Sequence, residues 1–387
     1  MKIAFIGDYP LDTNLMSGGV EAVSCNIVEG LAKLNNLDLH VITCRRQIEK
    51  AYVTKRKNTI IHYLPGQRRL NRSAMDVFDV IRIRRKLYEI APDVIHSHDQ
   101  GRYTYAALTT KYPVVMTISS ISSEGFRMKN SLRDRFLRKL SSRLMENRCL
   151  GMAKDIIAIS PYVMQTFSKR TNATFHNIPN PVRDGFFRLP NNEQRNRLLF
   201  AGRVVPLKGI HVLLEALALI KAQIQDVTLH IAGPILERDY YAKLNNLIRK
   251  NNLIDNVVFL GLLNESRLMD EYSKCAIFVL PTFTESFSLV SAQALAAGKP
   301  VIASDVGGIP SVINDGETGF LVRVDDAESI SQKITTLLQD DDLRKMMGEQ
   351  GRSIAAKRFA TDIIARQTRS IYDLIYERYK KATKCSQ

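Results

Sequence analysis

Short apolar segments rich in β-branched residues alternate with helical patterns along the chain, and one stretch rich in Pro and Asn, 175–196, interrupts them. Strands that are apolar throughout and separated by helices are typical of buried parallel sheets. We therefore predict two doubly wound α/β domains, residues 1–182 and 183–364, and a long basic helix at the end of the chain. The predicted strands are 2–8, 39–44, 93–98, 113–119 and 155–160 before the interruption, and 197–203, 227–234, 256–261, 275–282 and 300–305 after it.

The 387-residue chain is long enough for two hydrophobic cores. No apolar run approaches the roughly 20 residues that a membrane-spanning helix needs. The opening MKIAFIGDYP predicts a first strand rather than a signal peptide. Five scattered cysteines without metal-type spacing indicate reduced thiols, so we expect a cytoplasmic protein.

The formal charge of +16 is concentrated in the first half of the chain. Residues 1–182 carry 28 Lys and Arg against 15 Asp and Glu, whereas residues 183–387 carry 27 against 24. This asymmetry predicts a surface for something anionic, and a membrane, a nucleic acid and a phosphorylated substrate all fit. Nucleic acid is the least favoured, because the chain has no Trp and no recognition motif.

The densest basic segment is 127–148, with eight basic and two acidic residues in 22 positions. Its apolar stripe consists of Leu132, Phe136, Leu140 and Leu144. The helix could face an anionic membrane on the inner side of the cell. It could equally be an ordinary amphipathic helix that packs its stripe on the N-terminal sheet.

Ligands bind beyond the carboxyl ends of the strands in open α/β sheets, so polar residues at strand ends are candidates for a site. Gly202-Arg203 ends one predicted strand, and Lys208-Gly209 begins the next helix. Two cations beside a helix N-terminus suit a diphosphate, which Arg can bind in a forked geometry and Lys as a point charge. Surface charge at an ordinary turn explains the same residues equally well.

Two other strand ends carry candidates. Gly18-Gly19 could let the backbone approach a ligand, although a plain turn capped by Ser17 is an equal alternative and no GxGxxG pattern indicates a dinucleotide. His96, His98 and Asp99 end another strand, but a metal site would need a third ligand that the sequence does not supply. His98 is the better functional candidate because it lies nearer the strand end.

Glu285 lies between a predicted strand and the helix that follows it. The amides of Ser286, Phe287 and Ser288 after it could face an anion at the N-terminus of this helix. A simple capping role for the carboxylate is the alternative.

Five segments in this order resemble the retaining glycosyltransferases of family 4 (group 1), which have the GT-B architecture. They are SGGVE at 17–21, DVIHSHD at 93–99, AGRVVPLKG at 201–209, the run ESFSLVSAQALAAGKPVIASDVGGIPSVINDGETGFLV at 285–322 and the C-terminal helix. The resemblance covers essentially the whole chain. It implies two Rossmann-like domains facing a central cleft, an acceptor-side domain at 1–182 and a nucleotide-sugar domain at 183–364. The helix at about 365–387 would pack back on the first.

The resemblance also implies roles for the candidate residues. Arg203 and Lys208 would bind the donor diphosphate, and Glu285 would hold hydroxyls of the transferred sugar. His98 would lie beside the donor sugar, so Glu285 and His98 are the catalytic candidates. The other donor-binding candidates are Gly18, Gly19, Ser286, Phe287, Ser288, Leu289 and Gln293. Arg, Lys and helix dipoles would replace a divalent ion, so no metal or other cofactor is expected.

Three positions depart from the family pattern. Gln293 replaces the second Glu of Glu-x7-Glu, which in the family accepts hydrogen bonds from ribose hydroxyls. Ser288 replaces a frequent Gly and would add a hydroxyl near the donor, and Val23 stands near a position that often holds His.

The resemblance therefore implies retaining, metal-independent transfer of a hexose from a UDP- or GDP-linked donor to an acceptor hydroxyl. The acceptor would be a lipid-linked saccharide in polysaccharide or lipopolysaccharide synthesis, with 127–148 on the membrane. Two alternatives stay open: a nucleotide-sugar epimerase, and a non-catalytic homologue that binds membranes or polyanions.

Overall fold

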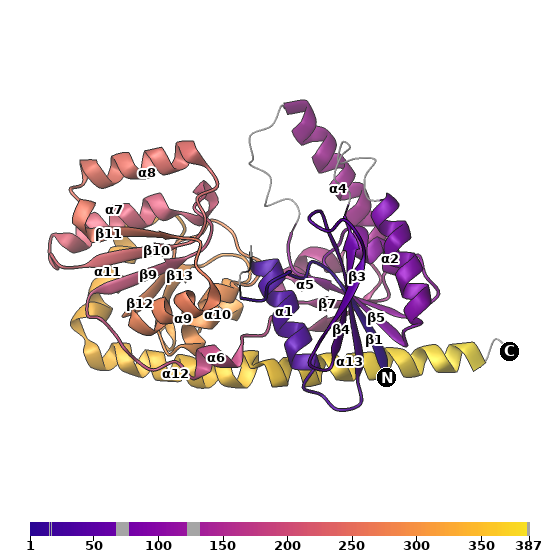
Figure 1. Cartoon of the computed structure of the whole chain (residues 1–387). Coiled ribbons are helices and arrows are strands. Elements are labelled where there is room, and N and C mark those ends of the chain that lie inside the picture. Colours follow the sequence, from indigo (N-terminus) through magenta and orange to yellow (C-terminus); the bar gives the residue numbers. More distant parts are fainter. Residues whose placement is uncertain (15, 17, 67–76, 122–131, 385–387) are drawn as a thin grey trace. The chain divides into compact units, whose positions relative to one another are not determined.

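The computed structural model describes residues 1–14, 16, 18–66, 77–121 and 132–384, with the backbone alone for 132–141. The chain divides into two compact units (Figure 1). Unit 1 comprises Met1–Leu11, Ser17–Pro181 and Thr361–Gln387, and unit 2 comprises Asp12–Met16 and Val182–Ala360. Besides the short segment Asp12–Met16, the chain thus enters unit 2 after Pro181 and returns to unit 1 in its last helix.

Unit 1 contains an eight-stranded sheet in the order β3-β4-β2-β1-β5-β6-β7-β8, parallel except for β3. All five strands predicted for this half are present. Three others, β3, β4 and β8, were not predicted. Strand β3 is largely exposed and carries Lys55 and Arg56, β8 runs into the stretch rich in Pro and Asn, and β4 is mostly buried but its apolar run TIIHYLP was overlooked. The strands are β1 (Lys2–Ile6), β2 (Asp38–Arg45), β3 (Tyr52–Arg56), β4 (Thr59–Pro65), β5 (Val94–His98), β6 (Val114–Ile118), β7 (Asp155–Ala158) and β8 (Thr174–Asn177).

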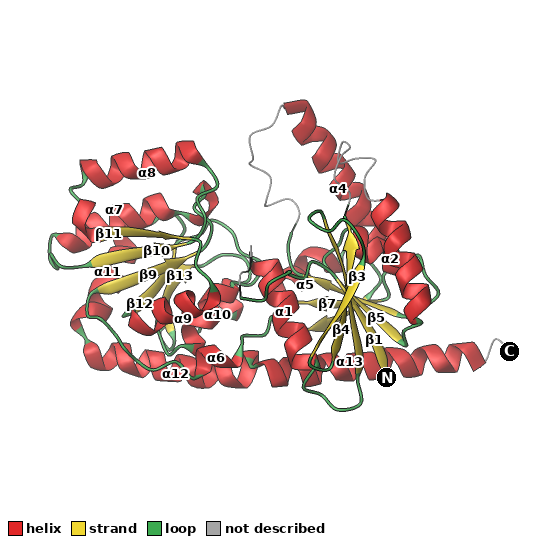
Figure 2. Cartoon of the chain, in the orientation of Figure 1, coloured by secondary structure: helices red, strands yellow, loops and turns green. Residues whose placement is uncertain are grey.

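Helices cover this sheet on both faces (Figure 2). They are α1 (Gly19–Leu31), α2 (Val77–Ile90), α3 (Arg102–Leu108), α4 (Leu132–Met152), α5 (Pro161–Ser168) and α13 (Thr361–Lys384). Helix α1 packs against α13, and α3 packs against α2 and α4. Successive residues of β5 point to opposite faces of the sheet. Ile95 belongs to the core beneath α2 and α3, whereas His96 is hydrogen-bonded to Tyr372 of α13.

The C-terminal helix α13 is anchored at two places in unit 1. A Cβ at Gly30 of α1 would lie 2.7 Å from the carbonyl oxygen of Thr361, so this glycine allows the two helices to approach closely. Farther along, the Tyr372 hydroxyl lies 2.6 Å from Nδ1 of His96, whose Nε2 lies 2.7 Å from the Thr117 hydroxyl. Apolar packing and a buried polar chain therefore both hold this helix.

Unit 2 contains a parallel six-stranded sheet in the order β11-β10-β9-β12-β13-β14. Its strands are β9 (Arg197–Ala201), β10 (Thr228–Ala232), β11 (Val257–Gly261), β12 (Ile277–Leu280), β13 (Val301–Ser304) and β14 (Gly319–Val322). Its helices are α6 (Asp184–Phe187), η1 (Pro206–Lys208), α7 (Ile210–Lys221), α8 (Arg238–Lys250), η2 (Ile254–Asn256), α9 (Glu265–Lys274), α10 (Leu289–Ala296), η3 (Ile309–Ser311), α11 (Ala327–Gln339) and α12 (Asp341–Phe359). Helix α7 contacts α8 and α11, and α10 contacts α12.

Both units are therefore doubly wound α/β domains, and the predicted fold class is confirmed. Apart from β3, β8 and β11, the described strands are buried along most of their length, which is why their sequences are continuously apolar rather than alternating. Among the described residues, no helix combines the length and the apolar character that crossing a membrane requires.

The basic segment 127–148 is described only in part: residues 127–131 lie outside the described residues, and so do the side chains of 132–141. Leu144, the last residue of the predicted stripe, is 58% exposed, whereas Glu146 is buried and paired with Arg170. At this end of α4, the helix therefore does not pack the predicted stripe inward.

Candidate functional site

In unit 2 the structure brings Lys208 and Glu285 together. Lys208 ends the short helix η1, and Glu285 lies in the loop between β12 and α10. Their side chains form an ion pair, and both are largely shielded from solvent. The pair joins the two loops at the carboxyl ends of β9 and β12, where a doubly wound sheet binds its ligands.

The two loops are held together by their backbones as well. The amide of Phe283 donates to the carbonyl oxygen of Leu207 at 2.9 Å, and the Thr282 hydroxyl donates to the same oxygen. Gly209 has a left-handed backbone (φ 67°), and a Cβ there would lie 1.8 Å from the carbonyl oxygen of Pro281. Only glycine fits this position. The close approach of the two loops, which places Lys208 beside Glu285, therefore requires Gly209.

The loop that carries Glu285 rests on a second glycine. The amide of Gly308 donates to the carbonyl oxygen of Glu285 at 2.8 Å, and a Cβ on Gly308 would lie 2.1 Å from the carbonyl oxygen of Ser286. Sequence reasoning missed this supporting role. The adjacent pair Gly307-Gly308 after a strand was the signal that could have revealed it.

Helix α10 begins with an unusual residue. Ser288 is its N-cap and has a left-handed backbone (φ 78°), the conformation that favours glycine. Its hydroxyl accepts from the amide of Ser291 and lies 2.7 Å from that residue's hydroxyl, and the side chain is only 3% exposed. The extra hydroxyl expected near a donor is therefore used to cap the helix.

The remaining candidates of unit 2 differ in exposure. Phe287 is buried against Phe359, with ring centroids 5.6 Å apart, whereas Ser286 and Leu289 are partly exposed. Gln293 is 6% exposed, and its carboxamide makes no hydrogen bond with any residue that the structure describes. Arg203 follows β9 and is exposed, and within the described ranges its guanidinium has no ion-pair partner.

In unit 1, His98 ends β5 and is 2% exposed. Its Nδ1 lies 2.8 Å from the Ser24 hydroxyl of α1, and a Cβ on Gly7 would lie 2.9 Å from the Cβ of His98. Nε2 has no hydrogen-bond partner among the described residues. Burial lowers the pKa of His98 to about 4, so the imidazole is neutral near pH 7.

Ser24 and Gly7 are supporting residues that sequence reasoning missed. Ser24 was detectable as a hydroxyl within the apolar, helical pattern of α1. Gly7 directly follows β1, where a side chain would collide with His98.

Gly18 and Gly19 start helix α1, six and five residues before Ser24. The Gly18 backbone is extended, and a Cβ on either glycine would meet nothing within 4 Å. Packing within unit 1 therefore does not require glycine there. The alternative cap, Ser17, lies outside the described residues.

The neighbours of His98 have other surroundings. His96 is fully engaged by Tyr372 and Thr117, and burial lowers its pKa to about 3. Asp99 has a left-handed backbone (φ 74°), and desolvation raises the pKa of its carboxyl to about 6 although the Ser120 hydroxyl donates to it. No three His, Cys, Asp or Glu side chains in the described part of the chain are arranged to hold a metal ion.

The four described cysteines are buried and form no disulfide with one another. Burial raises the pKa of the thiols of Cys44, Cys149 and Cys275 to about 12, which keeps them protonated and unreactive.

Two family models match the chain. "Glycosyltransferase Family 4" matches residues 17–185, and "Glycosyl transferases group 1" matches residues 183–354. Among curated proteins, the capsular polysaccharide biosynthesis glycosyltransferase CapM of Staphylococcus aureus is 27% identical over 89% of this chain and 92% of its own length.

Solved glycosyltransferase structures share the whole fold. Sucrose-phosphate synthase from Thermosynechococcus elongatus superposes with a TM-score of 0.79 at 22% identity, over 97% of this chain and 99% of its own. Anabaena HepE, solved in complex with UDP-glucose, superposes with a TM-score of 0.74 at 19% identity, over 96% and 99%. With its two Rossmann-like units in the GT-B architecture, this chain belongs to the group 1 glycosyltransferases of family 4.

Proposed function

We propose that this glycosyltransferase moves a hexose from a UDP- or GDP-linked donor to an acceptor hydroxyl, with retention at the anomeric carbon and without a metal ion. The observation that carries the proposal is the Lys208–Glu285 ion pair beside the N-terminus of α10. A cation, a carboxylate and free helix amides at one strand edge can bind a diphosphate and sugar hydroxyls together.

Each residue has a distinct task in this scheme. Lys208 and the exposed Arg203 stabilise the negative charge that develops on the departing nucleoside diphosphate. Glu285, held in place by Gly308, accepts hydrogen bonds from sugar hydroxyls. The amides from Ser286 to Leu289 contribute donors at the start of α10.

On the unit 1 side, His98 works as a neutral imidazole, because its pKa of about 4 keeps it unprotonated at neutral pH. Its unpartnered Nε2 is the atom available to the donor sugar or the acceptor. Gly18-Gly19 gives the substrate an approach to the backbone. The bond from the anomeric carbon to the diphosphate breaks while the acceptor oxygen attacks the same face, and the acceptor proton leaves with the diphosphate.

The relatives support the substrate classes. HepE was solved with UDP-glucose, and CapM is named for capsular polysaccharide synthesis. We extend this to a nucleotide-sugar donor and a lipid-linked saccharide acceptor, in polysaccharide or lipopolysaccharide synthesis. The enzyme would work in the cytoplasm, at the membrane's inner face.

Calorimetry tests the donor site first: UDP, GDP and ADP are titrated without metal into the enzyme and into Arg203→Ala. One nucleotide should bind, and the variant should lose at least tenfold in affinity, since a charge-assisted contact to phosphate contributes about 1.5–3 kcal/mol. Binding of no nucleotide would refute the donor site. Analysis of the anomeric product by NMR then tests retention, and epimerised donor in the absence of acceptor would indicate an epimerase instead.

A further inference from the structure

Helix α2 exposes a row of large apolar side chains. Val77, Phe78, Ile81 and Tyr88 are between 45% and 58% exposed. Their spacing of three to four residues, continued through position 85, places them along one side of the helix, while Ile83 and Leu87 on the other side are completely buried. We call these four residues with Arg82 and Arg85 the α2 outer face. The described part of unit 1 leaves it uncovered.

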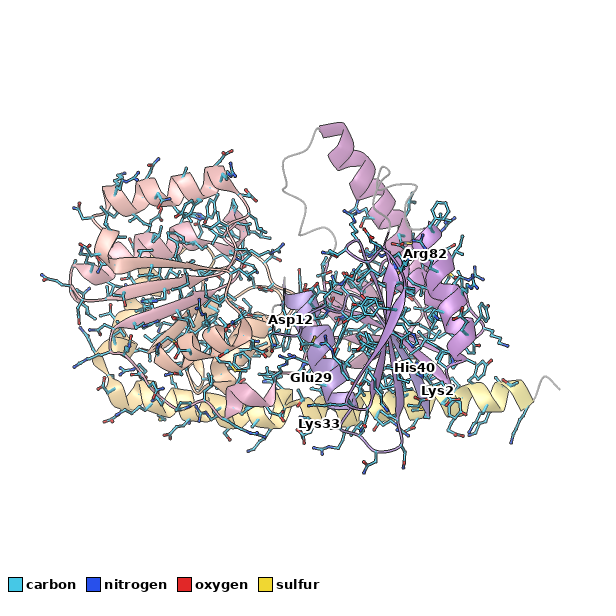
Figure 3. All side chains as sticks on the ribbon, viewed as in Figure 1. Lys2, Asp12, Glu29, Lys33, His40 and Arg82 are labelled. Carbon is cyan, nitrogen blue, oxygen red and sulfur yellow. The ribbon has the colours of Figure 1, made fainter. Side chains whose placement is uncertain are left out.

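Cations flank the apolar row. Arg85 is almost fully exposed, and Arg82, labelled in Figure 3, is also exposed although its guanidinium reaches the buried Asp79. At the end of the row, Tyr88 lies 5.9 Å from Tyr112, ring centroid to ring centroid, and Lys111 lies over the Tyr112 ring. Among the described residues of α2, the exposed acid on this side is Glu89, which pairs with Arg85 and Lys86.

Apolar, aromatic and cationic groups in this arrangement match the boundary of an anionic bilayer. Phe and Ile can enter the acyl region, Tyr favours the head-group level, and Arg binds lipid phosphates. A second copy of this chain is a poorer partner, because a two-fold contact would bring Arg82 and Arg85 against like charges. The excess of 13 positive charges in residues 1–182 favours the same anionic partner.

We propose that the α2 outer face docks unit 1 onto an anionic lipid surface. This assigns membrane contact to residues outside 127–148, the segment whose charge density alone suggested it. The inference rests on the proposed function in one respect: the reason for docking is to bring the enzyme to a lipid-linked acceptor. Docking itself needs neither donor nor acceptor.

Vesicle flotation tests the proposal with the full chain. The enzyme should float with equimolar phosphatidylglycerol and phosphatidylcholine and remain behind with phosphatidylcholine alone. The double substitution Phe78→Ser/Ile81→Ser should lower partitioning at least tenfold, because two exposed apolar side chains that would transfer into lipid are replaced by polar ones. Arg85→Gln should lower it about fivefold, the contribution of one cation near such a surface.

Matched controls come from unit 2. Ile254 and Val258 are exposed apolar residues, and Arg323 is an exposed cation, so Ile254→Ser/Val258→Ser and Arg323→Gln make the same chemical changes elsewhere. These controls should change flotation less than twofold. Calorimetry with UDP, run in parallel, reports the proposed donor site independently of lipid, so either hypothesis can fail alone.

Three outcomes would overturn the docking proposal. Equal flotation of the α2 variants and the parent would place the membrane contact elsewhere. Equal binding to phosphatidylcholine alone would remove the role of the cations. A dimer seen in sedimentation, and lost in Phe78→Ser/Ile81→Ser, would show that the face joins two copies of this chain.

Discussion

Ser288 affects the stability of unit 2 in two opposite ways, through its strained backbone and through its capping hydroxyl. Its left-handed backbone costs about 1 kcal/mol for a residue with a Cβ, whereas its hydroxyl caps α10. Ser288→Gly removes the strain and loses only a few tenths of a kcal/mol of capping. We expect the variant to raise the free energy of unfolding of unit 2 by about 0.5–1 kcal/mol in urea denaturation.

Ser288→Ala provides the matched control, because it keeps the strain and loses the cap. It should lower the same free energy by about 1 kcal/mol. If Gly and Ala changed stability equally, backbone conformation would not matter at this position.

In the proposed donor site, the side chain at position 293 influences the affinity for the ribose of the nucleotide. An amide oxygen accepts a neutral hydrogen bond, whereas a carboxylate would accept a charge-assisted bond about twice as strong. On the proposed ribose contact, Gln293→Glu should tighten UDP or GDP binding about fivefold in calorimetry. Because position 293 is buried, the free variant should also lose stability through desolvation of the new charge.

The control for this prediction is the ligand rather than the protein. A nucleotide that lacks both the 2′ and 3′ hydroxyls should bind Gln293→Glu and the parent equally. A gain that persisted with this nucleotide would place the carboxylate elsewhere than on the ribose.

Among the elements of unit 1, α13 is held by apolar packing and, farther along, by the buried contact of Tyr372 with His96. Tyr372→Phe leaves Nδ1 of the buried His96 without its partner, which costs about 1–3 kcal/mol. We expect amide exchange in the carboxyl half of α13 to accelerate more than in α1. Tyr379, exposed on the same helix, supplies the control Tyr379→Phe, which should leave exchange unchanged. Equal acceleration in both variants would contradict a specific anchor.

The elements also show how far sequence reasoning reaches. Continuous apolar runs indicate buried parallel strands such as β5 and β12, so the fold class was predictable. Strand β3 was not, because an edge strand with exposed Lys and Arg side chains lacks that pattern.

The candidate site was predictable in its residue types but not in its contacts. The meeting of Lys208 with Glu285 depends on Gly209 against Pro281, a contact between residues 72 positions apart in the chain. The cap formed by Ser288 depends on a backbone angle that the sequence does not encode locally, since glycine is the usual residue for it.

For the whole molecule, the distribution of buried histidines predicts that unit 1 responds to acid before unit 2. Burial lowers the pKa of four histidines of unit 1: His62 and His98 to about 4, His96 to about 3, and His40 in the same direction. In unit 2 a lowered pKa applies to His211.

The sign follows from proton binding. An unfolded histidine takes up a proton near pH 6.5, whereas these folded ones do not, so stability is intact above pH 6.5 and falls as the pH drops toward 4. Each group contributes a slope of about 1.4 kcal/mol per pH unit. Asp99 opposes this below pH 6, because its raised pKa makes the folded state the one that binds the proton.

Hydrogen exchange at pH 7, 6 and 5 in mild urea measures both units in one experiment. Between pH 6 and pH 5, three histidines with folded pKa values of about 3 to 4 act against Asp99, so the free energy of unfolding of unit 1 should fall by roughly 3 kcal/mol per pH unit. Its β5 and β6 amides should exchange first. His62→Gln, which removes one of these three histidines, should roughly halve this slope, because the net proton uptake on unfolding falls from about two to about one. Earlier exchange in β9 and β12 would mean that acid acts through the carboxylate pairs of unit 2 rather than through the buried imidazoles of unit 1.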